Sequence, residues 1–494
     1  MKSPFNFAVK KENGLMYDMY ELGVWVSYFH IYSPNVIIEK VTVPGMPGAH
    51  VTDIREDERK IAIELQLEAE SIVKFDDLKH QIFNIFFSKE KLTIIRDMYP
   101  NQEIYAYLEG EYDIDNITDR DGNVPLTLTM PDPYKYGPEV SVKFTSDVFT
   151  LTNIGTAETP PMFELEVFKP VTFAMIQNQD NEYMMIGKPT DINSQVIDTK
   201  TLVLEERGET LNTWLKSPTT VDGGVVAGTF GSDNAGITVS DYGTGENWHG
   251  PALIKEIAPI DDFEVSLFCE VSQYMRNETF RIEYYLFDEY MNALGKMAIV
   301  DPSLEFYQIE GEGRYGGFTV GDHSNYPISS TNYKYTNWDY FNGLLRMKRI
   351  GNQFEFYIAR IADDGTHYYI AKQTYTDTKK QYTGRVKYVQ IHIGTYGDEG
   401  YPGQSGVQDY VRINSLKVYK LAKENKDQTP YIAYPNDIIK FDMKTKDILI
   451  NGESRMDLKD FGATFFNLKK GDNQLVVMPR DSFRVKVSYR ERYR

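Results

Sequence analysis

Apolar residues in the first quarter of the chain change from strand spacing to helix spacing. Every second residue of one run is apolar, namely Ile61, Ile63, Leu65 and Leu67. This period of two predicts a half-buried strand over residues 61–68. Helical spacing follows at Leu78, Ile82, Ile85 and Phe86. Because Asp76 and Asp77 suit the positive end of a helix dipole, we expect a helix at residues 76–87. Residues 1–135 are therefore predicted to form one α+β unit.

Residues 136–203 and 428–494 share a second pattern, in which short apolar runs are divided by tight turns. The last run alternates apolar residues (Phe483, Val485, Val487, Tyr489) with polar ones (Ser482, Arg484, Lys486, Ser488). Successive side chains of a strand point to opposite faces, so this strand is expected to have one apolar and one basic face. Both segments are predicted to be β.

Residues 204–427 lie between these segments and differ from them in composition. This block contains three of the four Trp residues, is rich in Gly and Tyr, and ends in a polar linker at 423–428. Its strand-like runs recur about every 8–12 residues with turn signals between them, which is typical of a β-sandwich. A chain of 494 residues has room for roughly three domains of about 150 residues.

Composition narrows the possible partners and the compartment. The net charge of −19 argues against nucleic acid, because binding phosphates requires clustered Lys and Arg. Cys269 is the only cysteine, so no internal disulfide can form and the chain is expected to mature in a reducing compartment. No run approaches the ~20 apolar residues of a membrane span, and the N-terminus lacks a secretory apolar core.

Sequence patterns for catalysis and cofactor binding are weak throughout the chain. Residues 311–316 match G-x-G-x-x-G, but a strand-like run follows where a dinucleotide site needs a helix. Residues 119–123 and 363–365 have calcium-like acids without an EF-hand pattern, and the seven His residues are isolated. Cys269 alternates with apolar residues and is predicted to be a buried thiol. We therefore expect no cofactor, no metal and no catalytic residue.

Glycoside hydrolysis requires two placed carboxylates, which several hydrolases with a sandwich fold carry as E-x-D-x-E on one strand. Residues 204–427 contain no such triplet, and their nearest acidic runs, 288–289 and 398–399, are adjacent pairs. Adjacent residues of a strand point to opposite faces. We therefore predict that the chain is not an enzyme.

Aromatic residues in Gly-, Asn- and Asp-rich segments are the best signal for binding. Sugars present apolar ring faces to Trp and Tyr, whose polar edges still reach hydrogen-bond partners. The candidates for saccharide binding are Trp248, Tyr335, Trp338, Tyr340, Tyr396 and Tyr401. The alternative is that half or more of them are core or loop-anchoring residues, as an aromatic-rich sandwich requires.

Two stretches far apart in the chain carry a recognisable pattern. The first is Pro131-Asp132-Pro133-Tyr134-Lys135-Tyr136-Gly137, and the second runs from Phe465-Phe466-Asn467-Leu468 through Gly471-Asp472-Asn473 to the basic end 484–494. Preceded by the strand, the helix and Tyr105-Ala106-Tyr107-Leu108, they resemble the distal tail protein (Dit) family of long-tailed bacteriophages that infect Gram-positive bacteria. The resemblance covers residues 1–203 and 428–494.

The resemblance implies a mainly β protein with three parts. In such proteins an N-terminal domain, here 1–135, builds a hexameric ring, and a galectin-like sandwich, here 136–203 and 428–494, follows it. Residues 204–427 interrupt that sandwich and resemble a laminin-G or concanavalin-type jelly roll, like the carbohydrate-binding modules of evolved members. The implied place is the virion tail tip, after synthesis in the host cytoplasm.

The implied partners are the tail tube protein, the tape measure protein, tail-associated lysin or receptor-binding proteins, and host cell-wall polysaccharide or teichoic acid. Neither nucleic acid nor membrane is expected. We place the ring interface on the predicted strand and helix, at Ile61, Ile63, Leu78 and Ile82; the alternative is that these residues form the core of their own domain. Two other functions stay open: a polysaccharide-degrading enzyme and a laminin-G-like surface-binding protein.

Overall fold

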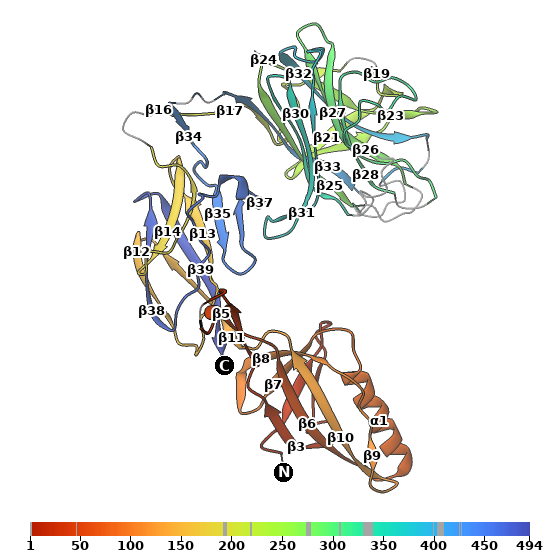
Figure 1. Ribbon diagram of the computed structural model, residues 1–494. Coiled ribbons are helices and arrows are strands. Elements are labelled where there is room, and N and C mark those ends of the chain that lie inside the picture. The colour runs from red at the N-terminus through yellow and green to blue at the C-terminus, as the bar shows by residue number, and fades with distance from the viewer. Residues whose placement is uncertain are drawn as a thin grey trace.

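The computed structural model describes residues 2–494 except 46, 191–194, 218–219, 273–277, 306–307, 330–337, 339, 399, 403–409, 424 and 426. Nearly all regular structure in this part is β, and α1 (Ile72–Phe86) is its only α-helix. Figure 1 shows three lobes, each with its own hydrophobic cluster. The mainly β fold is confirmed. None of the helices in the described ranges is long and apolar enough to cross a membrane.

The N-terminal domain packs α1 against a sheet. β6 lies between β3 and β10, and β1, β7 and β8 pair in that order beside them. Alternate residues of β3, β6 and β10 point into one hydrophobic cluster, which α1 covers with its apolar face. The elements are β1 Phe7–Lys10, β2 Met16–Asp18, β3 Val24–Ile31, β4 Val36–Val41, β5 His50–Glu56, β6 Arg59–Glu68, β7 Leu92–Arg96, β8 Tyr99–Leu108, β9 Asp115–Asn116 and β10 Asp121–Met130.

The helix begins one turn earlier than the sequence analysis predicts. Ser71 is its N-cap, with the hydroxyl oxygen accepting a hydrogen bond from the backbone N–H of Lys74 at 3.3 Å. A serine in this position satisfies a backbone donor that the helix leaves free. Asp76 and Asp77 therefore lie in the second turn, and the cap signal that was missed is Ser71.

The residues expected at a ring interface lie inside the domain instead. Ile61, Ile63 and Ile82 are at most 1% exposed, and Leu78 packs against the same cluster. β6 is also paired on both edges, so its backbone cannot pair with a second subunit while the domain stays folded, and its apolar side chains face the core. This corrects the expectation: burial supports the alternative that these four residues form intradomain core.

The second lobe is a two-sheet sandwich, called here the host sandwich. One sheet has the order β11-β39-β13-β35-β36-β37 and the other β12-β38-β14-β15, with a shared core between them. Its elements come from both ends of the chain: β11 Lys135–Phe144, β12 Val148–Asn153, β13 Met162–Val167, β14 Phe173–Asn178, β15 Tyr183–Gly187, β35 Ile438–Asp442, β36 Asp447–Ile450, β37 Glu453–Ser454, the 3-10 helix η2 Met456–Leu458, β38 Gly471–Met478 and β39 Phe483–Tyr493.

The C-terminal strand joins the host sandwich to the N-terminal domain. β39 pairs with β11 so that Tyr136 lies opposite Arg492, which brings together the two stretches that carry the family pattern. The guanidinium of Arg490 forms an ion pair with Glu103 of β8 at 2.9 Å, and Arg494 forms one with Glu56 at 2.6 Å. The basic face of the last strand therefore holds the two domains together.

The third lobe, called the insert, is a separate sandwich with its own core. One sheet has the order β21-β22-β33-β25-β29-β30-β31 with β17 beside β33; the other has the order β19-β20-β23-β32-β26-β27-β28 with β24 beside β32 and β18 beside β24. Its strands are β17 Lys200–Glu206, β18 Leu215–Lys216, β19 Thr220–Val221, β20 Gly224–Val226, β21 Thr229–Asp233, β22 Gly236–Asp241, β23 Trp248–Gly250, β24 Ala252–Ile260, β25 Phe263–Ser272, β26 Phe280–Asp288, β27 Ala293–Asp301, β28 Glu310–Tyr315, β29 Asn342–Ile350, β30 Gln353–Ile361, β31 His367–Thr376, β32 Val386–Tyr396 and β33 Tyr410–Leu421.

The chain enters and leaves the insert side by side. β16 (Gln195–Ile197) pairs with β34 (Gln428–Pro430) in parallel, and within the insert Lys200 lies opposite Leu421. β17 thus joins the insert's sheet a few residues before the expected boundary at 204. Adjacent ends let a folded module enter a loop of another domain with little disturbance of either.

Polar contacts hold the insert against the host sandwich. Arg346 of β29 reaches both carboxylate oxygens of Glu453 in β37, at 2.6 and 2.8 Å. The backbone N–H of His367 donates to the carbonyl of Gly452 at 3.0 Å. Burial alone would raise the pKa of Glu453, but the bonds and charge of Arg346 outweigh it and lower the pKa to about 2. A bidentate, partly buried pair fixes orientation as well as distance.

Candidate functional site

The six aromatic candidates do not form one group. Trp338 is 2% exposed and packs against Phe341 in the insert core, so the expectation that it contacts a ligand is corrected. Tyr401 is half-buried and packs against Tyr242. Tyr340 is exposed, and Tyr335 lies outside the described residues. Core packing therefore accounts for part of the set, as the alternative anticipated.

Trp248 and Tyr396 form an aromatic pair where β23 begins and β32 ends. They are register partners on β23 and β32, their ring centroids are 5.7 Å apart, and Tyr396 is 40% exposed. A loop beside them is fixed by the exposed Asp398, which accepts a hydrogen bond from the backbone N–H of Gly245 at 2.8 Å. An apolar ring surface with carboxylate and amide groups around it is the usual form of a sugar-binding surface.

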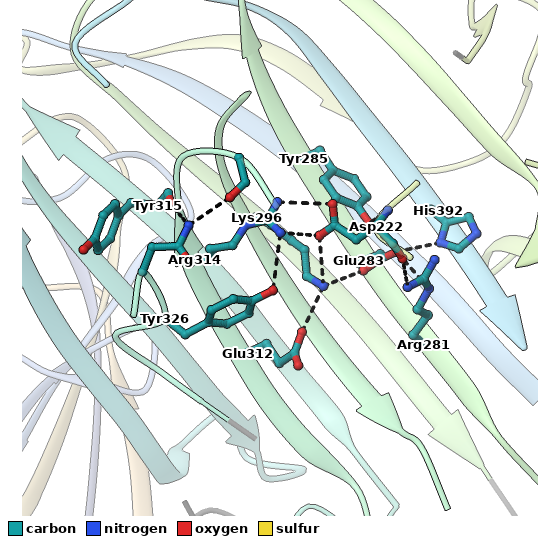
Figure 2. Close-up of polar contacts among 12 residues, drawn as sticks. Asp222, Arg281, Glu283, Tyr285, Lys296, Glu312, Arg314, Tyr315, Tyr326 and His392 are labelled. Atoms are coloured by element: carbon teal, nitrogen blue, oxygen red, sulfur yellow. Dashed lines mark hydrogen bonds and ion pairs between the residues drawn. The ribbon is translucent and has the colours of Figure 1, made fainter. Parts of the chain in front are cut away.

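The same face of this sheet carries a buried polar network centred on Glu283 (Figure 2). One carboxylate oxygen of Glu283 accepts from the hydroxyl of Tyr285 at 2.6 Å and lies 2.7 Å from Nδ1 of His392. Arg281 and Lys296 form ion pairs with this carboxylate at 3.1 and 3.0 Å. The guanidinium of Arg281 also lies over the ring of Trp248, 4.9 Å from its centroid. The network therefore begins directly beneath the aromatic pair.

Lys296 and Asp222 extend the network across three strands. The ammonium group of Lys296 lies 2.9 Å from Glu312 and 3.5 Å from Asp222, which occupies the β19–β20 turn. Arg314 forms an ion pair with Asp222 at 2.5 Å and donates to the hydroxyl of Tyr326 at 3.3 Å. The network thus pairs three carboxylates with three cations, as buried charges require. The carboxylates are Asp222, Glu283 and Glu312, and the cations are Arg281, Lys296 and Arg314.

The network keeps its charges fixed, which does not suit acid catalysis. Burial alone would raise the pKa of Glu283, but Arg281, Lys296 and the hydrogen bond with His392 hold it well below its usual value. Burial likewise would lower the pKa of Lys296, but Glu283 and Glu312 raise it well above its usual value. A general acid needs a carboxyl that stays protonated near neutral pH. Glu283 is therefore a permanent anion that orders the sheet face.

His392 makes the stability of the insert depend on pH. Burial lowers its pKa to about 4 from 6.5, although the bond to Glu283 opposes this. As pH falls, the imidazole is therefore protonated in the unfolded chain before it is protonated in the folded one. The stability that the neutral, buried His392 contributes is complete above pH 6.5 and is lost as pH falls toward 4. We expect a loss on the order of 3 kcal/mol over this window, measured by urea unfolding of the insert at several pH values.

His392→Gln is expected to flatten that pH dependence, because glutamine does not titrate. His323→Gln, at an exposed position of the same domain, is the matched control and should leave the slope as in the wild type. An unchanged slope in His392→Gln would show that other groups cause the acid sensitivity.

Sequence reasoning missed the polar network, although β26 contains a signal for it. Arg281, Glu283 and Tyr285 alternate with Ile282 and two further core residues, so the strand has one polar and one apolar face. The network residues come from four strands, the β19–β20 turn and the segment after β28 that holds Tyr326, and no single run contains them. Among the described residues, no group of three or more His, Cys, Asp or Glu side chains could hold a metal ion. Cys269 is fully buried in the insert core, as predicted.

Comparison with known proteins gives two matches to family models. Residues 17–130 match the phage tail protein RIFT-related domain, and residues 410–493 match the C-terminal domain of the siphovirus-type tail component. No curated protein matches the chain.

Several solved structures resemble parts of the chain. SPP1 Dit, described as a paradigm of the hub adsorption apparatus in phages infecting Gram-positive bacteria, is 18% identical, with 37% of this chain and 74% of that one covered and a TM-score of 0.31. The CBM2 module of the evolved Dit of Lactobacillus casei BL23 phage J-1 is 15% identical, with 47% and 100% covered and a TM-score of 0.38. A family GH16 endo-β-1,3(4)-glucanase is 10% identical, with 46% and 98% covered and a TM-score of 0.27.

The two family models match the two ends of the chain in the order in which the sequence pattern placed them. The first match lies within the N-terminal domain. The second begins at β33, the last strand of the insert, and covers the C-terminal part of the host sandwich. The insert lies between β16 and β34 of this framework. The two ends of the chain are thus similar to two domains of siphovirus tail components, as the pattern resembling the distal tail (Dit) family predicts, and a second β-sandwich is inserted between them.

Proposed function

We propose that this chain forms the hexameric hub ring at the tail tip, and that its insert binds a saccharide of the host cell wall. The observation that carries the proposal is the pairing of two tail domains with an independently packed sandwich that presents Trp248 and Tyr396. On this proposal the ring joins the tail tube to the adhesion apparatus. Six copies of one weak site would give firm attachment through avidity.

Saccharide binding is expected to depend on the aromatic pair. Stacking of a sugar ring on Trp248 and Tyr396 removes apolar surface from water, while the network beneath holds the indole through Arg281. Loss of either ring is expected to weaken binding about 10-fold, equivalent to about 1.4 kcal/mol. The test is calorimetric titration of full-length Trp248→Ala and Tyr396→Ala with purified cell-wall polysaccharide and with teichoic acid.

Trp25→Ala provides the matched control, because Trp25 has an exposure close to that of Tyr396 but lies in the N-terminal domain. It should bind as the wild type does. Wild-type binding by both site variants would place the saccharide elsewhere on the insert. Release of reducing sugar from the same polymers would instead favour a polysaccharide-degrading enzyme.

A further inference from the structure

Asp222, at the tip of the β19–β20 hairpin, is held by three cations of the sheet face that the hairpin covers (Figure 2). Its carboxylate accepts hydrogen bonds from both terminal nitrogens of Arg314, at 2.5 and 3.3 Å, and lies 3.5 Å from Nζ of Lys296. Its backbone carbonyl accepts from Arg281 at 2.7 Å. A guanidinium that donates two hydrogen bonds to one carboxylate is also how proteins bind an acidic ligand. The hairpin thus brings to the sheet face the kind of group that such a ligand would bring.

The same sheet face carries several polar atoms that have no hydrogen-bond partner within the part of the chain that the structure describes. They include Nη2 of Arg281, Nε of Arg314, Nε2 of His392 and Oε1 of Gln390. These four side chains are at most 5% exposed, and they lie on β26, β28 and β32. Buried polar atoms in folded proteins are nearly always paired. Unpaired donors and an acceptor gathered on one face therefore indicate a site for a polar ligand, and they suit the hydroxyls of a saccharide.

The β19–β20 hairpin covers this face with few apolar contacts. β19 lies at the end of the sheet, and β20 joins it through three residue pairs with β23. The apolar side chains of the hairpin belong to a small cluster apart from the main core of the insert, formed by Val221, Val226, Ala252, Tyr285 and Phe287. Segments with few buried apolar contacts open locally at a small cost in free energy. Opening of the hairpin would expose the polar face of β26, β27 and β28.

We propose that this sheet face is a saccharide subsite for a uronic acid, whose carboxylate takes the place of the Asp222 carboxylate when the hairpin opens. This inference rests on the proposed function, because it names a class of sugar for the insert. The exchange keeps three carboxylates against three cations, so no buried charge is left unbalanced. The guanidinium of Arg281 contacts both Asp222 and the ring of Trp248, so one saccharide chain can reach the subsite and the aromatic pair together.

Asp222 acts as an internal competitor of the ligand on this account. Only chains with an open hairpin bind the uronic acid, so the apparent affinity is reduced by the fraction of chains that are open. Asp222→Asn keeps the shape of the side chain but removes the charge that holds the hairpin closed. The variant is therefore expected to bind D-glucuronate about 10-fold more tightly than the wild type does. Binding of D-glucose, which lacks the carboxylate, should be equally weak in both.

The test is a titration of the full-length chain with each sugar, followed by saturation-transfer NMR of the sugar signals. Glucose 6-phosphate is the third sugar, because a guanidinium also binds phosphate. The matched control is Asp233→Asn, which removes an ion pair with Arg412 at 2.8 Å from a hairpin turn of the other sheet. It should bind glucuronate as the wild type does. Circular dichroism shows that each variant is folded.

Hydrogen exchange of the wild type checks the opening of the hairpin without any substitution. A bound ligand usually slows the exchange of backbone amides around it. Here glucuronate is expected to speed exchange at residues 221–226, because the bound sugar holds the hairpin away from the sheet. Unchanged or slower exchange in this segment would contradict the displacement of Asp222.

The outcomes separate this inference from the proposed function. Equal affinity of the wild type and Asp222→Asn for glucuronate would overturn the inference, and so would tighter binding of glucose 6-phosphate. If no chain binds glucuronate while cell-wall polysaccharide still binds through Trp248 and Tyr396, the inference falls and the proposed function stands. Glucuronate binding as expected, together with wild-type polysaccharide binding by both aromatic variants, would support the subsite and overturn the role of the aromatic pair.

Discussion

Replacing Lys296 with methionine is expected to lower the stability of the insert by about 3–5 kcal/mol, the usual cost of removing one partner of a buried ion pair. Lys296 is 4% exposed and neutralises Glu283 and Glu312 together. Methionine is close to lysine in length but leaves Glu283 and Glu312 without the cation that they share. For a domain of this size the midpoint of thermal unfolding should fall by roughly 10 °C. Differential scanning calorimetry of the full chain measures it.

Two further variants show whether Lys296→Met lowers stability through the unbalanced carboxylates or through lost packing. Adding Glu283→Gln to Lys296→Met is expected to restore part of the stability, because removing both partners costs less than removing one. Lys387→Met, which removes a more exposed ion pair with Glu256 on the same domain, should change stability by under about 1 kcal/mol. A double variant no more stable than Lys296→Met would contradict this account of the network.

Local periodicity predicted the strands well because each strand's pattern is contained in a few residues. The run from Ile61 to Leu67 became β6, and the last run from Phe483 to Tyr489 became β39. The same patterns could not tell an interface from a core. Alternating apolar residues indicate only that one face of the strand is buried. For β6 the element that buries this face is α1 of the same domain.

The candidate site was only partly predictable for a related reason. Trp248 and Tyr396 are far apart in the chain, and only the pairing of β23 with β32 makes them neighbours. Trp338 occurs in an equally polar, turn-rich segment, yet it faces the core. The composition of the sequence around an aromatic residue thus does not determine whether its side chain faces the core or the solvent. Nothing in the local sequence distinguishes Glu283 or Lys296 from other polar strand residues, because only the pairing of β26 with β27 brings them to 3.0 Å.

A chain that ends at Asp481 is expected to lose the fold of the host sandwich while the insert stays folded. β39 lies between β11 and β13 and fills the core with Phe483, Val485, Val487 and Tyr489. Burying four such side chains contributes roughly 6–12 kcal/mol, which is close to the whole stability of a domain. Calorimetry should therefore show the loss of one transition and the persistence of the insert's own transition.

The insert is expected to stay folded because of where its two ends leave it, and not because its own free energy of unfolding is high. Its two ends meet at Lys200 and Leu421, and its core contains no residue of the host sandwich. The fragment 200–422 should therefore unfold near the midpoint that the insert shows in the truncated chain, and should bind cell-wall polysaccharide as that chain does. Among the contacts it gives up are the ion pair between Arg346 and Glu453, the backbone bond from His367 to Gly452 and the ion pair between Asp364 and Lys440, which serve orientation. Loss of the insert's transition together with that of the host sandwich would show that the two form one cooperative unit.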